Sequence, residues 1–410
     1  MREKKKQFIY IGDFDFRNEN VQSFLVKNNG KILSELGYHL DFIGINTKNN
    51  IYNNSIVLEK KTIENFSYWE LPNSLSFKGM FFFIKIINHI IKILNEILNY
   101  GPVSGVITYQ CPTYAYAIKK IGLWCKKNKI PYIVNCADLP IFDQQPFHRK
   151  IIMKFNWMYM HRQNKLFANG IIAVSHYIQE FYSNNETPSI IIPPLFDSSA
   201  LTFLKTKENN VPTFIYAGTP FKSYGKPVNP KGMKDRLDKV IDLFSLVSEL
   251  GIEYRLEIIG ISYDEYLLGV PRHNKFLEKT NSILFYGRLS HAETIQKVAL
   301  SDFSINYRDD NMMTKAGFST KIVESVSLGT PVIINDIGDY FDYLTDGESG
   351  FKLHSKMEDN VSLINRLCLM PASERYKLKK LLLIKNIFFY KNYKNLMRDF
   401  LYNINKKFND

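Results

Sequence analysis

One stretch of the sequence combines a helix start with a cation and a carboxylate. In KAGFSTKIVESVSLGTPVIIND, residues 315–336, Ser319 or Thr320 can cap a helix that the following L-G-T-P ends. The free N–H groups and positive dipole of a helix start suit a pyrophosphate, and Lys321 adds a charge there. Glu324 shares a face with Lys321, where its carboxylate could hold the diol of a ribose. The alternative from spacing alone is an exposed helix with a Lys–Glu ion pair.

Strand-like and helix-like segments alternate through the first 200 residues. The apolar runs QFIYIGD, HLDFIGIN, VSGVITY, IPYIVNCAD, GIIAVS and SIIIPPL are typical of buried strands. Between them, the spacing of apolar residues predicts helices at residues 20–36, 80–100 and 114–127. Strands that alternate with helices indicate a parallel sheet covered by helices.

The alternation restarts after a polar stretch, LKTKENNVP, at residues 204–212. TFIYAGT, YRLEIIG, SILFYG, FSINYR and PVIIND are expected strands, with helices at residues 235–250, from His291 and from about Thr320. Residues 372–410 read as a helical, basic end. We therefore expect two doubly wound domains, at residues 1–204 and 205–385, and a C-terminal helix at 386–410 that crosses back to the first domain.

The composition is that of an ordinary globular protein with a surplus of positive charge. A chain of 410 residues with 45% hydrophobic and 23% charged residues can bury two cores. No stretch approaches the roughly 20 uncharged apolar residues of a spanning helix, and the N-terminus does not read as a signal peptide. The four cysteines lack C-x-x-C spacing and a disulfide framework, which predicts a reducing, cytoplasmic location.

A net charge of +13 fits an anionic membrane leaflet, a phosphorylated substrate, or charge that is merely solvated. No RNP motif, zinc knuckle or helix-turn-helix is visible, so no nucleic-acid partner is expected. Two segments mix apolar and basic residues: FKGMFFFIKIINHIIKILNEILNY at 77–100 and RKIIMKFNWMYMHRQNKLF at 149–167. Either could lie on an anionic membrane surface, and the alternative for each is a helix that covers the sheet.

The segment at 315–336 resembles the donor-site segment of retaining, family 4-type (group 1) glycosyltransferases of the GT-B fold, where F-P-T-K-x-x-E precedes G-x-P-V-I. IYAGT at 215–219, RLEIIG at 255–260, FYGRLSHAE at 285–293 and DGESGF at 346–351 are similar to further landmarks of that family, in the expected order. KILSELGYHLDFIG and ANGIIAVSHYI resemble pieces of its N-terminal half. The resemblance implies an α/β GT-B fold, with two Rossmann-like doubly wound domains that face each other across a cleft.

The resemblance also implies a nucleotide-sugar donor site in the C-terminal half. Glu324 matches the glutamate that binds the ribose, and Gly218 and Thr219 match the loop that approaches the phosphates. Lys321, Arg288 and Lys234 match basic residues that neutralise the diphosphate leaving group, with Lys321 and Arg288 as catalytic residues. The full set of implied donor-binding residues is Gly218, Thr219, Lys234, Arg288, Arg308, Ser319, Thr320, Lys321 and Glu324.

This chain departs from the family pattern at two positions. Family members often carry an E-x7-E pair, and its first glutamate would fall at Ala316 here, so the identity of the transferred sugar stays open. Thr219 stands where many members have Arg, and Lys222 or Lys226 would supply that charge instead.

The N-terminal half offers an acidic residue and a polar residue after expected strands. Asp138 follows the strand in YIVNCADLP, where the family often places an acidic residue near the acceptor or the sugar; it is the third expected catalytic residue. The alternative for Asp138 is a turn or helix cap. Asn20, in the region after the first strand, is the expected acceptor-binding residue.

Asp13 and Asp15 form a D-x-D pair, which is the metal motif of GT-A glycosyltransferases. In those enzymes the motif follows a complete nucleotide-binding unit, whereas here it ends the first strand, where a turn explains both aspartates. The histidines show no H-x-x-x-H pair on a recognisable helix. We therefore expect no cofactor and no metal.

Together these features predict a retaining, metal-independent glycosyltransferase. It would move a sugar from a nucleotide-sugar donor to a saccharide or lipid-linked saccharide acceptor in surface polysaccharide synthesis, in the cytoplasm or on the cytoplasmic face of a membrane. Two alternatives stay open. A non-catalytic GT-B-like binding or complex-forming protein would explain Ala316, and a nucleotide-sugar epimerase shares the fold.

Overall fold

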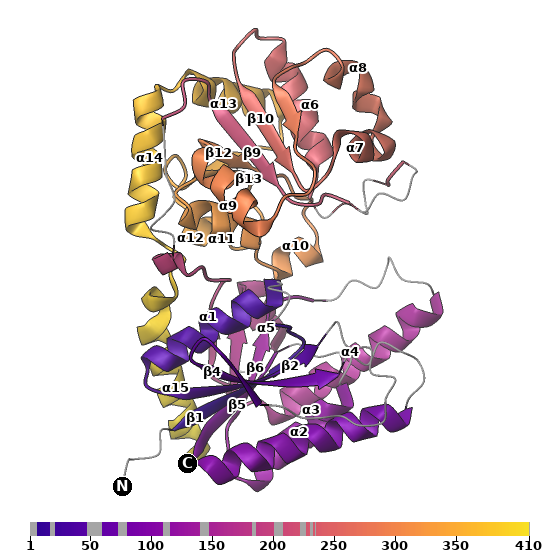
Figure 1. The fold of residues 1–410 in the computed structure, drawn as a ribbon, viewed down its shortest axis with the longest axis vertical. Helices are drawn as coiled ribbons and strands as arrows, with labels where there is room; N and C mark the ends of the chain where they lie inside the picture. The colour runs from indigo at the N-terminus through magenta and orange to yellow at the C-terminus, as the bar shows by residue number, and fades with distance from the viewer. Residues whose placement is uncertain are drawn as a thin grey trace. The chain divides into compact units, whose positions relative to one another are not determined.

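The structure is a computed structural model. It describes residues 6–16, 21–46, 60–72, 80–109, 115–139, 147–182, 186–200, 208–221, 227–229, 233 and 235–409. Internal contacts divide the chain into two compact units, drawn in Figure 1. The N-terminal unit holds residues Met1–Leu195 and Tyr390–Asp410, and the C-terminal unit holds residues Phe196–Phe389. This division precedes the polar stretch at 204–212, where the sequence suggested the boundary.

The described residues of the N-terminal unit form one eight-stranded sheet in the order β3-β4-β2-β1-β5-β6-β7-β8. Neighbouring strands are parallel except β3 and β4, an antiparallel pair that the sequence analysis did not predict. Every residue of the central strand β1 is buried, as expected for a parallel sheet with both faces covered. The strands are β1 (Gln7–Gly12), β2 (His39–Asn46), β3 (Lys60–Ile63), β4 (Phe66–Pro72), β5 (Val103–Tyr109), β6 (Tyr132–Cys136), β7 (Gly170–Ala173) and β8 (Ser189–Ile191).

Helices pack on this sheet through small residues and apolar faces. Gly30 of α1 lies against the ring of Phe42 on β2, and Gly170 of β7 lies against Ile404 and Phe400 of the C-terminal helix α15, so larger residues would not fit at either glycine. The helices of this unit are α1 (Val21–Glu35), α2 (Met80–Tyr100), α3 (Ala115–Lys127), α4 (Phe147–Phe167), α5 (His176–Tyr182) and α15 (Lys394–Asn409), with a 3-10 turn at Tyr390–Tyr393.

The C-terminal unit has a parallel sheet in the order β11-β10-β9-β12-β13-β14. In chain order this is 3-2-1-4-5-6, the order of the Rossmann fold. The rings of Phe214, Phe244 and Phe303 pack together at its centre, with centroids 5.2 and 5.5 Å apart. The strands are β9 (Thr213–Ala217), β10 (Arg255–Ile259), β11 (Ile283–Phe285), β12 (Phe303–Ile305), β13 (Val332–Asn335) and β14 (Gly350–Leu353).

Most helices of this unit begin after a strand and end before the next one. Three of them, α7, α9 and α10, start with complete capping boxes: Ser262 with Glu265, Ser290 with Glu293, and Asn311 with Thr314. The helices are α6 (Leu237–Ser248), α7 (Tyr263–Gly269), α8 (Asn274–Leu277), α9 (His291–Leu300), α10 (Met312–Ala316), α11 (Thr320–Ser327), α12 (Tyr340–Tyr343), α13 (Met357–Leu369) and α14 (Ala372–Lys385).

The end of the chain forms two helices with a break after residue 385, before the C-terminal helix expected at 386–410. The helix α14 ends at Lys385, and Asn386 takes a left-handed conformation with φ +40°. Such a residue cannot continue a right-handed helix, and Asn adopts this conformation more readily than most residues. The chain then continues through the 3-10 turn into α15, in the N-terminal unit.

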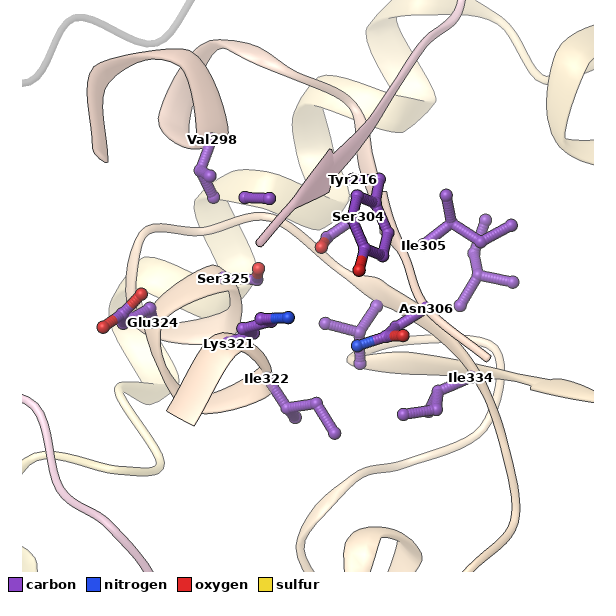
Figure 2. A pocket seen from close by; sticks show the side chains of 13 residues that line it. Tyr216, Val298, Ser304, Ile305, Asn306, Lys321, Ile322, Glu324, Ser325 and Ile334 are labelled. Atoms are coloured by element: carbon purple, nitrogen blue, oxygen red, sulfur yellow. The ribbon is translucent and has the colours of Figure 1, made fainter. Parts of the chain in front are cut away.

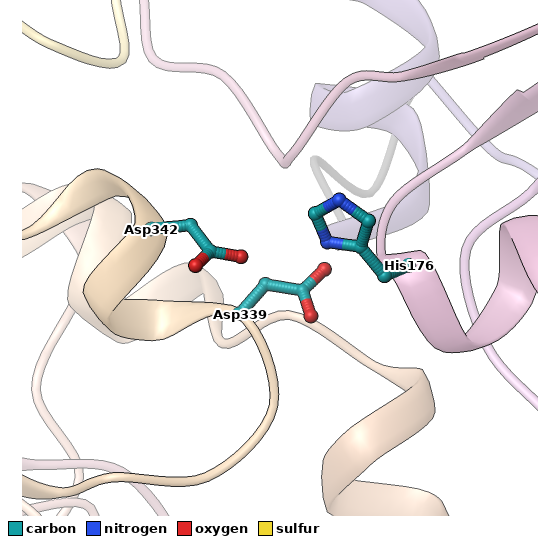
Figure 3. A group of neighbouring side chains, drawn as sticks. All are labelled: His176, Asp339 and Asp342. Atoms are coloured by element: carbon teal, nitrogen blue, oxygen red, sulfur yellow. The ribbon is translucent and has the colours of Figure 1, made fainter.

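The short helix α12 follows β13 and carries two aspartates. Asp339 is its N-cap residue and Asp342 lies in its first turn, where Figure 3 draws them. The negative charges of these two carboxylates suit the positive end of the helix dipole. His176, also drawn in Figure 3, is the first residue of α5 in the N-terminal unit.

Candidate functional site

The order of strands in the C-terminal unit creates a switch point between β9 and β12. Connections from these two neighbours run to opposite sides of the sheet, so the loops after their carboxyl ends diverge and leave room for a ligand. Gly218 and Thr219 follow β9, and Asn306 to Arg308 follow β12. The helix α11 supplies Lys321 and Glu324 next to this point, since both line one cavity with Tyr216 and Asn306.

Three loops at the carboxyl edge of the sheet hold one another through backbone hydrogen bonds. The N–H of Gly218 donates to the carbonyl of Ile259 at 2.8 Å, and the N–H of Gly260 donates to the carbonyl of Gly287 at 2.7 Å. The hydroxyl of Thr219 donates to the carbonyl of Gly260 at 3.2 Å. The loops after β9, β10 and β11 therefore form one connected edge, with the Thr219 side chain exposed on it.

Gly218 allows the closest approach in this edge. Its φ is +154°, and a Cβ placed there would overlap the end of the Lys321 side chain. The Lys321 ammonium therefore lies directly against the backbone of the loop after β9. Because any side chain at position 218 would displace it, glycine is required there for the position of this cation.

Asp235 joins two of the expected donor-site cations. One of its oxygens accepts a hydrogen bond from Nε of Arg308 at 2.8 Å, and the other pairs with the ammonium of Lys321. The side chains of Asp235 and Arg308 are only 2% and 5% exposed, whereas that of Lys321 is 27% exposed. Lys321 is thus the member of this triad that solvent or a ligand can reach.

The protonation state of Asp235 follows from its two partners. Burial alone would raise the pKa of this carboxyl, but the charges and hydrogen bonds of Lys321 and Arg308 outweigh burial and lower the pKa to about 2. The carboxylate is therefore ionised at every pH of interest. The single negative charge of Asp235 neutralises only one of its two cationic partners. The triad therefore carries a net charge of +1, which suits an anionic ligand.

Arg308 is held inside the unit and does not reach the surface. Its Nη1 donates to the hydroxyl of Tyr340 at 2.9 Å, and its backbone N–H donates to the side chain of Asn335 at 3.0 Å. The residue is 4% exposed. The structure therefore places Arg308 behind Asp235, where it fixes that carboxylate.

Lys321 and Glu324 do not form an ion pair, although they lie three residues apart on α11. Figure 2 shows the Lys321 ammonium pointing toward Tyr216 and Asn306, and the Glu324 carboxylate pointing away from it. Among the described residues, the Glu324 carboxylate has no hydrogen-bond or salt-bridge partner. The alternative from spacing, an exposed Lys–Glu pair, is therefore wrong, because Asp235 takes the ammonium instead.

Burial perturbs the carboxyl group of Glu324. It raises the pKa to about 7, although the charge of Lys321 opposes this shift. A partly buried, unpaired carboxylate is costly in a merely structural position. Carboxyl groups with such perturbed pKa values gather at functional sites.

Ser319 and the cavity beside Lys321 present polar atoms without partners. Ser319 is the N-cap residue of α11, but its hydroxyl makes no cap hydrogen bond, contrary to the capping role expected from the sequence. Within the described part of the chain, the buried Ser319 hydroxyl, the Tyr216 hydroxyl and the Asn306 amide lack hydrogen-bond partners. Tyr216 and Asn306 line a cavity of about 20 Å³ with Lys321, which suits a small polar group.

The remaining expected donor residues differ in position. Thr320 is the first residue of α11 and is partly buried. Arg288 follows β11 on the connected edge; its side chain is 74% exposed and lies 3.5 Å from a Glu265 oxygen. Lys234, together with Lys222 and Lys226, lies outside the described residues, as does Asn20 in the N-terminal unit.

The N-terminal unit brings two acidic residues to the carboxyl edge of its own sheet. Asp138 follows β6 and is partly buried, and its Oδ1 accepts the N–H of Leu139 at 3.0 Å. The buried Tyr109, at the end of β5, has a pKa raised well above its usual value by burial and by nearby acidic groups that include Asp138 and Asp13. Asp138 and Asp13 therefore lie close enough to act on the same phenol.

The D-x-D pair is divided between two environments. Asp13 is partly buried, and burial raises its pKa, whereas Asp15 is fully buried. Among the residues that the structure describes, neither belongs to a group of three or more His, Cys, Asp or Glu side chains placed to hold an ion. A turn after β1 is thus sufficient to explain the pair.

Comparison with known proteins adds to this geometry. The family profile described as glycosyl transferases, group 1, matches residues 232–381, which include Asp235, Arg308, Lys321 and Glu324. The chain carries a group 1 glycosyl transferase domain. No curated protein matches the sequence. The predicted resemblance to group 1 is thus confirmed.

The similarity to solved structures covers both units. Sucrose-phosphate synthase from Thermosynechococcus elongatus matches with a TM-score of 0.62 and 13% identity, over 98% of this chain and all of that one. Anabaena Alr3699/HepE in complex with UDP matches with a TM-score of 0.62 and 11% identity, over 97% of this chain and 99% of that one. The lipopolysaccharide outer core galactosyltransferase WaaB matches with a TM-score of 0.58 and 13% identity, over 96% of this chain and 99% of that one. The predicted GT-B class, with two Rossmann-like units, is confirmed.

Asp235 is a residue of this candidate site that the sequence analysis missed. The sequence predicts a helix over residues 235–250, but α6 begins at Leu237, so Asp235 precedes the helix. The sequence signal that could have identified Asp235 is its position directly after Lys234. If Lys234 binds a phosphate, the neighbouring carboxylate needs another cation as its counter-ion.

Proposed function

We propose that the protein transfers a sugar from a nucleotide-sugar donor to a saccharide or lipid-linked saccharide acceptor, with retention of the anomeric configuration and without a metal. The observation that carries this proposal is the position of Lys321: its ammonium lies against Gly218 at the switch point of a Rossmann-type sheet, on the same helix as the unpaired Glu324. A cation and a carboxylate so arranged suit the two halves of a nucleotide, its diphosphate and its ribose.

The site residues have separate roles in this reaction. As the bond from the sugar to the diphosphate breaks, negative charge grows on the leaving phosphate, and Lys321 and the N–H groups at the start of α11 stabilise it. Asp235 and Arg308 hold Lys321 in place. Glu324 accepts hydrogen bonds from the ribose hydroxyls, and Arg288, Thr219 and Lys234 add contacts to the phosphates.

The acceptor side is assigned to the N-terminal unit. Asp138 orients the acceptor hydroxyl or takes its proton, and Asn20 binds the acceptor. Two features support a carboxylate in this role: Asp138 follows the parallel strand β6 at its carboxyl end, and it is only partly buried. Surface polysaccharide synthesis on the cytoplasmic side of a membrane is the process that fits a lipid-linked acceptor and the net charge of +13.

Several comparisons support a nucleotide sugar as the donor. Two similar structures hold nucleotide sugars: HepE is in complex with UDP-glucose, and a trehalose-6-phosphate protein from E. coli is bound with UDP-2-fluoro glucose. These ligands belong to those proteins. We extend them to this chain because Gly218, Lys321 and Glu324 supply the donor chemistry described above.

One assay tests the function and the absence of a metal requirement. The full chain is incubated with UDP-, GDP- and ADP-sugars, with and without EDTA, and release of the nucleoside diphosphate is measured. We expect release with one donor class, unchanged by EDTA. Loss of activity with EDTA and recovery with manganese would support Asp13 and Asp15 instead.

The same assay separates the other candidate functions. The position of the first E-x7-E glutamate is occupied by Ala316, which is fully buried and supplies no carboxylate. Nucleotide binding without release from any donor would indicate a non-catalytic binding protein. Conversion of the nucleotide sugar into an epimer would indicate an epimerase.

A further inference from the structure

The surface of helices α3 and α4 in the N-terminal unit is both apolar and basic. The exposed apolar side chains of α4 include Ile151, Phe155, Met158 and Leu166, which are 42%, 67%, 51% and 70% exposed. Their spacing places them on one side of the helix, opposite Met160, which is 1% exposed and faces the unit's interior. Large apolar residues exposed in a row mark an interaction surface.

One turn of α4 is exposed on all sides. All five residues from Ile151 to Phe155 are exposed, in the sequence Ile-Ile-Met-Lys-Phe. No described segment of the unit buries these side chains. Exposure of four large apolar residues in one turn is costly in water, so a partner surface is needed.

The neighbouring helix α3 continues this surface. Tyr116 and Leu123 are 65% and 44% exposed, and the ring of Tyr116 lies 5.0 Å from that of Tyr159 on α4. Behind this contact the helices are close, because Gly122 of α3 lies against the ring of Phe167. The two helices therefore present one continuous face.

The charge of this face has a single sign. The helix α3 carries four lysines and α4 carries five lysines or arginines, and neither helix contains an aspartate or glutamate. Lys119, Lys120, Lys154, Arg162 and Lys165 are exposed beside the apolar side chains. A partner must therefore combine negative charge with an apolar interior.

An anionic lipid leaflet has both properties. Its headgroups attract lysine and arginine, and its acyl region takes up Ile, Met and Phe side chains. Aliphatic side chains such as Ile151 and Met153 offer no stacking to the bases of a nucleic acid. By contrast, described apolar residues of α2, including Ile86, Ile90, Ile93, Leu94 and Ile97, are buried, so that side of α2 faces the unit's interior.

We propose that the α3–α4 face docks on an anionic membrane, with the turn Ile151–Phe155 inserted among the lipids. This deepens the proposed function, because it assigns the membrane contact of a lipid-linked acceptor to one surface, and it rests on that part of the proposal. The orientation of the N-terminal unit on the membrane follows from it. Among the described residues no helix is long and apolar enough to cross a bilayer.

The test compares the full chain with variants in vesicle sedimentation. Vesicles contain phosphatidylcholine alone or phosphatidylcholine mixed with phosphatidylglycerol. We expect binding to the anionic vesicles only, weakened by salt. The triple variant K154Q/R162Q/K165Q should bind more weakly by roughly fivefold per removed charge, and Phe155→Ser by roughly tenfold.

A matched control and a spectroscopic probe make the result specific. Ile384→Ser removes an apolar side chain that is 80% exposed on α14 in the other unit, so it should bind like the unchanged protein. A tryptophan introduced as Phe155→Trp should shift its emission to shorter wavelength on anionic vesicles, whereas Ile384→Trp should not.

Several outcomes would overturn the proposal. These are equal recovery with neutral and anionic vesicles, full binding by Phe155→Ser, or tighter binding to a single-stranded oligonucleotide or an acidic protein than to the vesicles. Binding of UDP measured in the same variants distinguishes this failure from failure of the donor site, because neither α3 nor α4 contributes to that site.

Discussion

The ammonium of Lys321 pairs with the carboxylate of Asp235, although Glu324 lies on the same helix only three residues away. This choice leaves the Glu324 carboxylate without a salt bridge among the described residues, and it fixes Lys321 against Gly218. A fixed cation and an unpaired carboxylate on one short helix are the arrangement on which the donor-site proposal rests.

Glu324→Ala should weaken nucleotide binding but leave the fold intact. Hydrogen bonds to a charged group contribute about 1.5–3 kcal/mol, so the affinity for UDP should fall by roughly ten- to a hundredfold in calorimetry. The unchanged protein should prefer UDP over 2′-deoxy-UDP, and this preference should disappear in the variant. Glu278→Ala, an exposed glutamate at the end of α8, is the matched control. Unchanged affinity in folded Glu324→Ala would remove the donor site from α11.

Nucleotide-sugar affinity should depend on pH through Glu324. Burial raises the pKa of this group to about 7, and the proposed hydrogen bonds to the ribose need the ionised form. The affinity should therefore be constant above about pH 8 and fall below pH 7, by at most about tenfold per pH unit. A nucleotide sugar is the right probe because its phosphates do not titrate in this range. Glu324→Gln should bind weakly with a flat profile, and a parallel slope in that variant would assign the titration to another group.

Ionisation of Glu324 should lower the stability of the fold, although the same ionisation favours nucleotide-sugar binding. Because the folded pKa of Glu324 lies above the ordinary value of about 4.3, the folded state binds the proton more tightly than the unfolded state. The contribution of Glu324 to the free energy of unfolding is thus present at low pH and is lost as pH rises toward 7. Glu324→Gln should gain stability relative to the unchanged protein between pH 5 and 8 in urea denaturation. A constant difference over this range would contradict the raised pKa.

Lys321→Ala should reduce the transfer rate more than the affinity for the donor. The charge on the diphosphate grows as the sugar departs, so the cation contributes most in the transition state, and kcat should fall on the order of a hundredfold with a smaller change in KM. Lys315→Ala is the matched control, because Lys315 is an exposed lysine of α10 paired with Asp310. Equal effects of the two substitutions on kcat would exclude a special role for Lys321.

Asp235→Asn should destabilise the C-terminal unit. It leaves the buried guanidinium of Arg308 without its counter-ion, which costs about 3 kcal/mol or more and should lower Tm by roughly 10 °C. Asp310→Asn removes an aspartate of the same type from an exposed pair, where side chains are 46% and 62% exposed, and should change Tm very little. A small shift for both variants would mean that Asp235 does not anchor Arg308 and Lys321.

Local chemistry explains what the sequence determined by itself. The start of α11 at Thr320 and its end before Gly329 agree with the prediction, because the glycine signal and the 3.6-residue period act within a few residues, although Ser319 makes no cap hydrogen bond. The alternation of strands and helices likewise predicted two doubly wound units, since each strand run carries its own apolar signal. The β3–β4 pair was not predicted, because Lys60–Ile63 is short and holds only one apolar residue, so it carries no strand signal of its own.

The charge network needed the tertiary structure. Asp235 is separated by 86 residues from Lys321 and by 73 from Arg308, and no local pattern links such positions. The sequence placed Lys321 and Glu324 on one helix face correctly, but which carboxylate the ammonium pairs with depends on the turn before α6. Only folding brings that turn to the carboxyl edge of the sheet.

Which apolar helix faces are buried likewise depends on the tertiary structure. The sequence marked residues 77–100 and 149–167 as equal candidates for a membrane surface, because both mix apolar and basic residues. In the structure, Ile86, Ile90, Ile93, Leu94 and Ile97 of α2 are buried, whereas Ile151–Phe155 of α4 are exposed. The raised pKa of Glu324 has the same origin, since desolvation depends on the atoms that surround a group in space. A periodic pattern states that a helix has an apolar face, but only the packing of the other elements determines whether that face is covered.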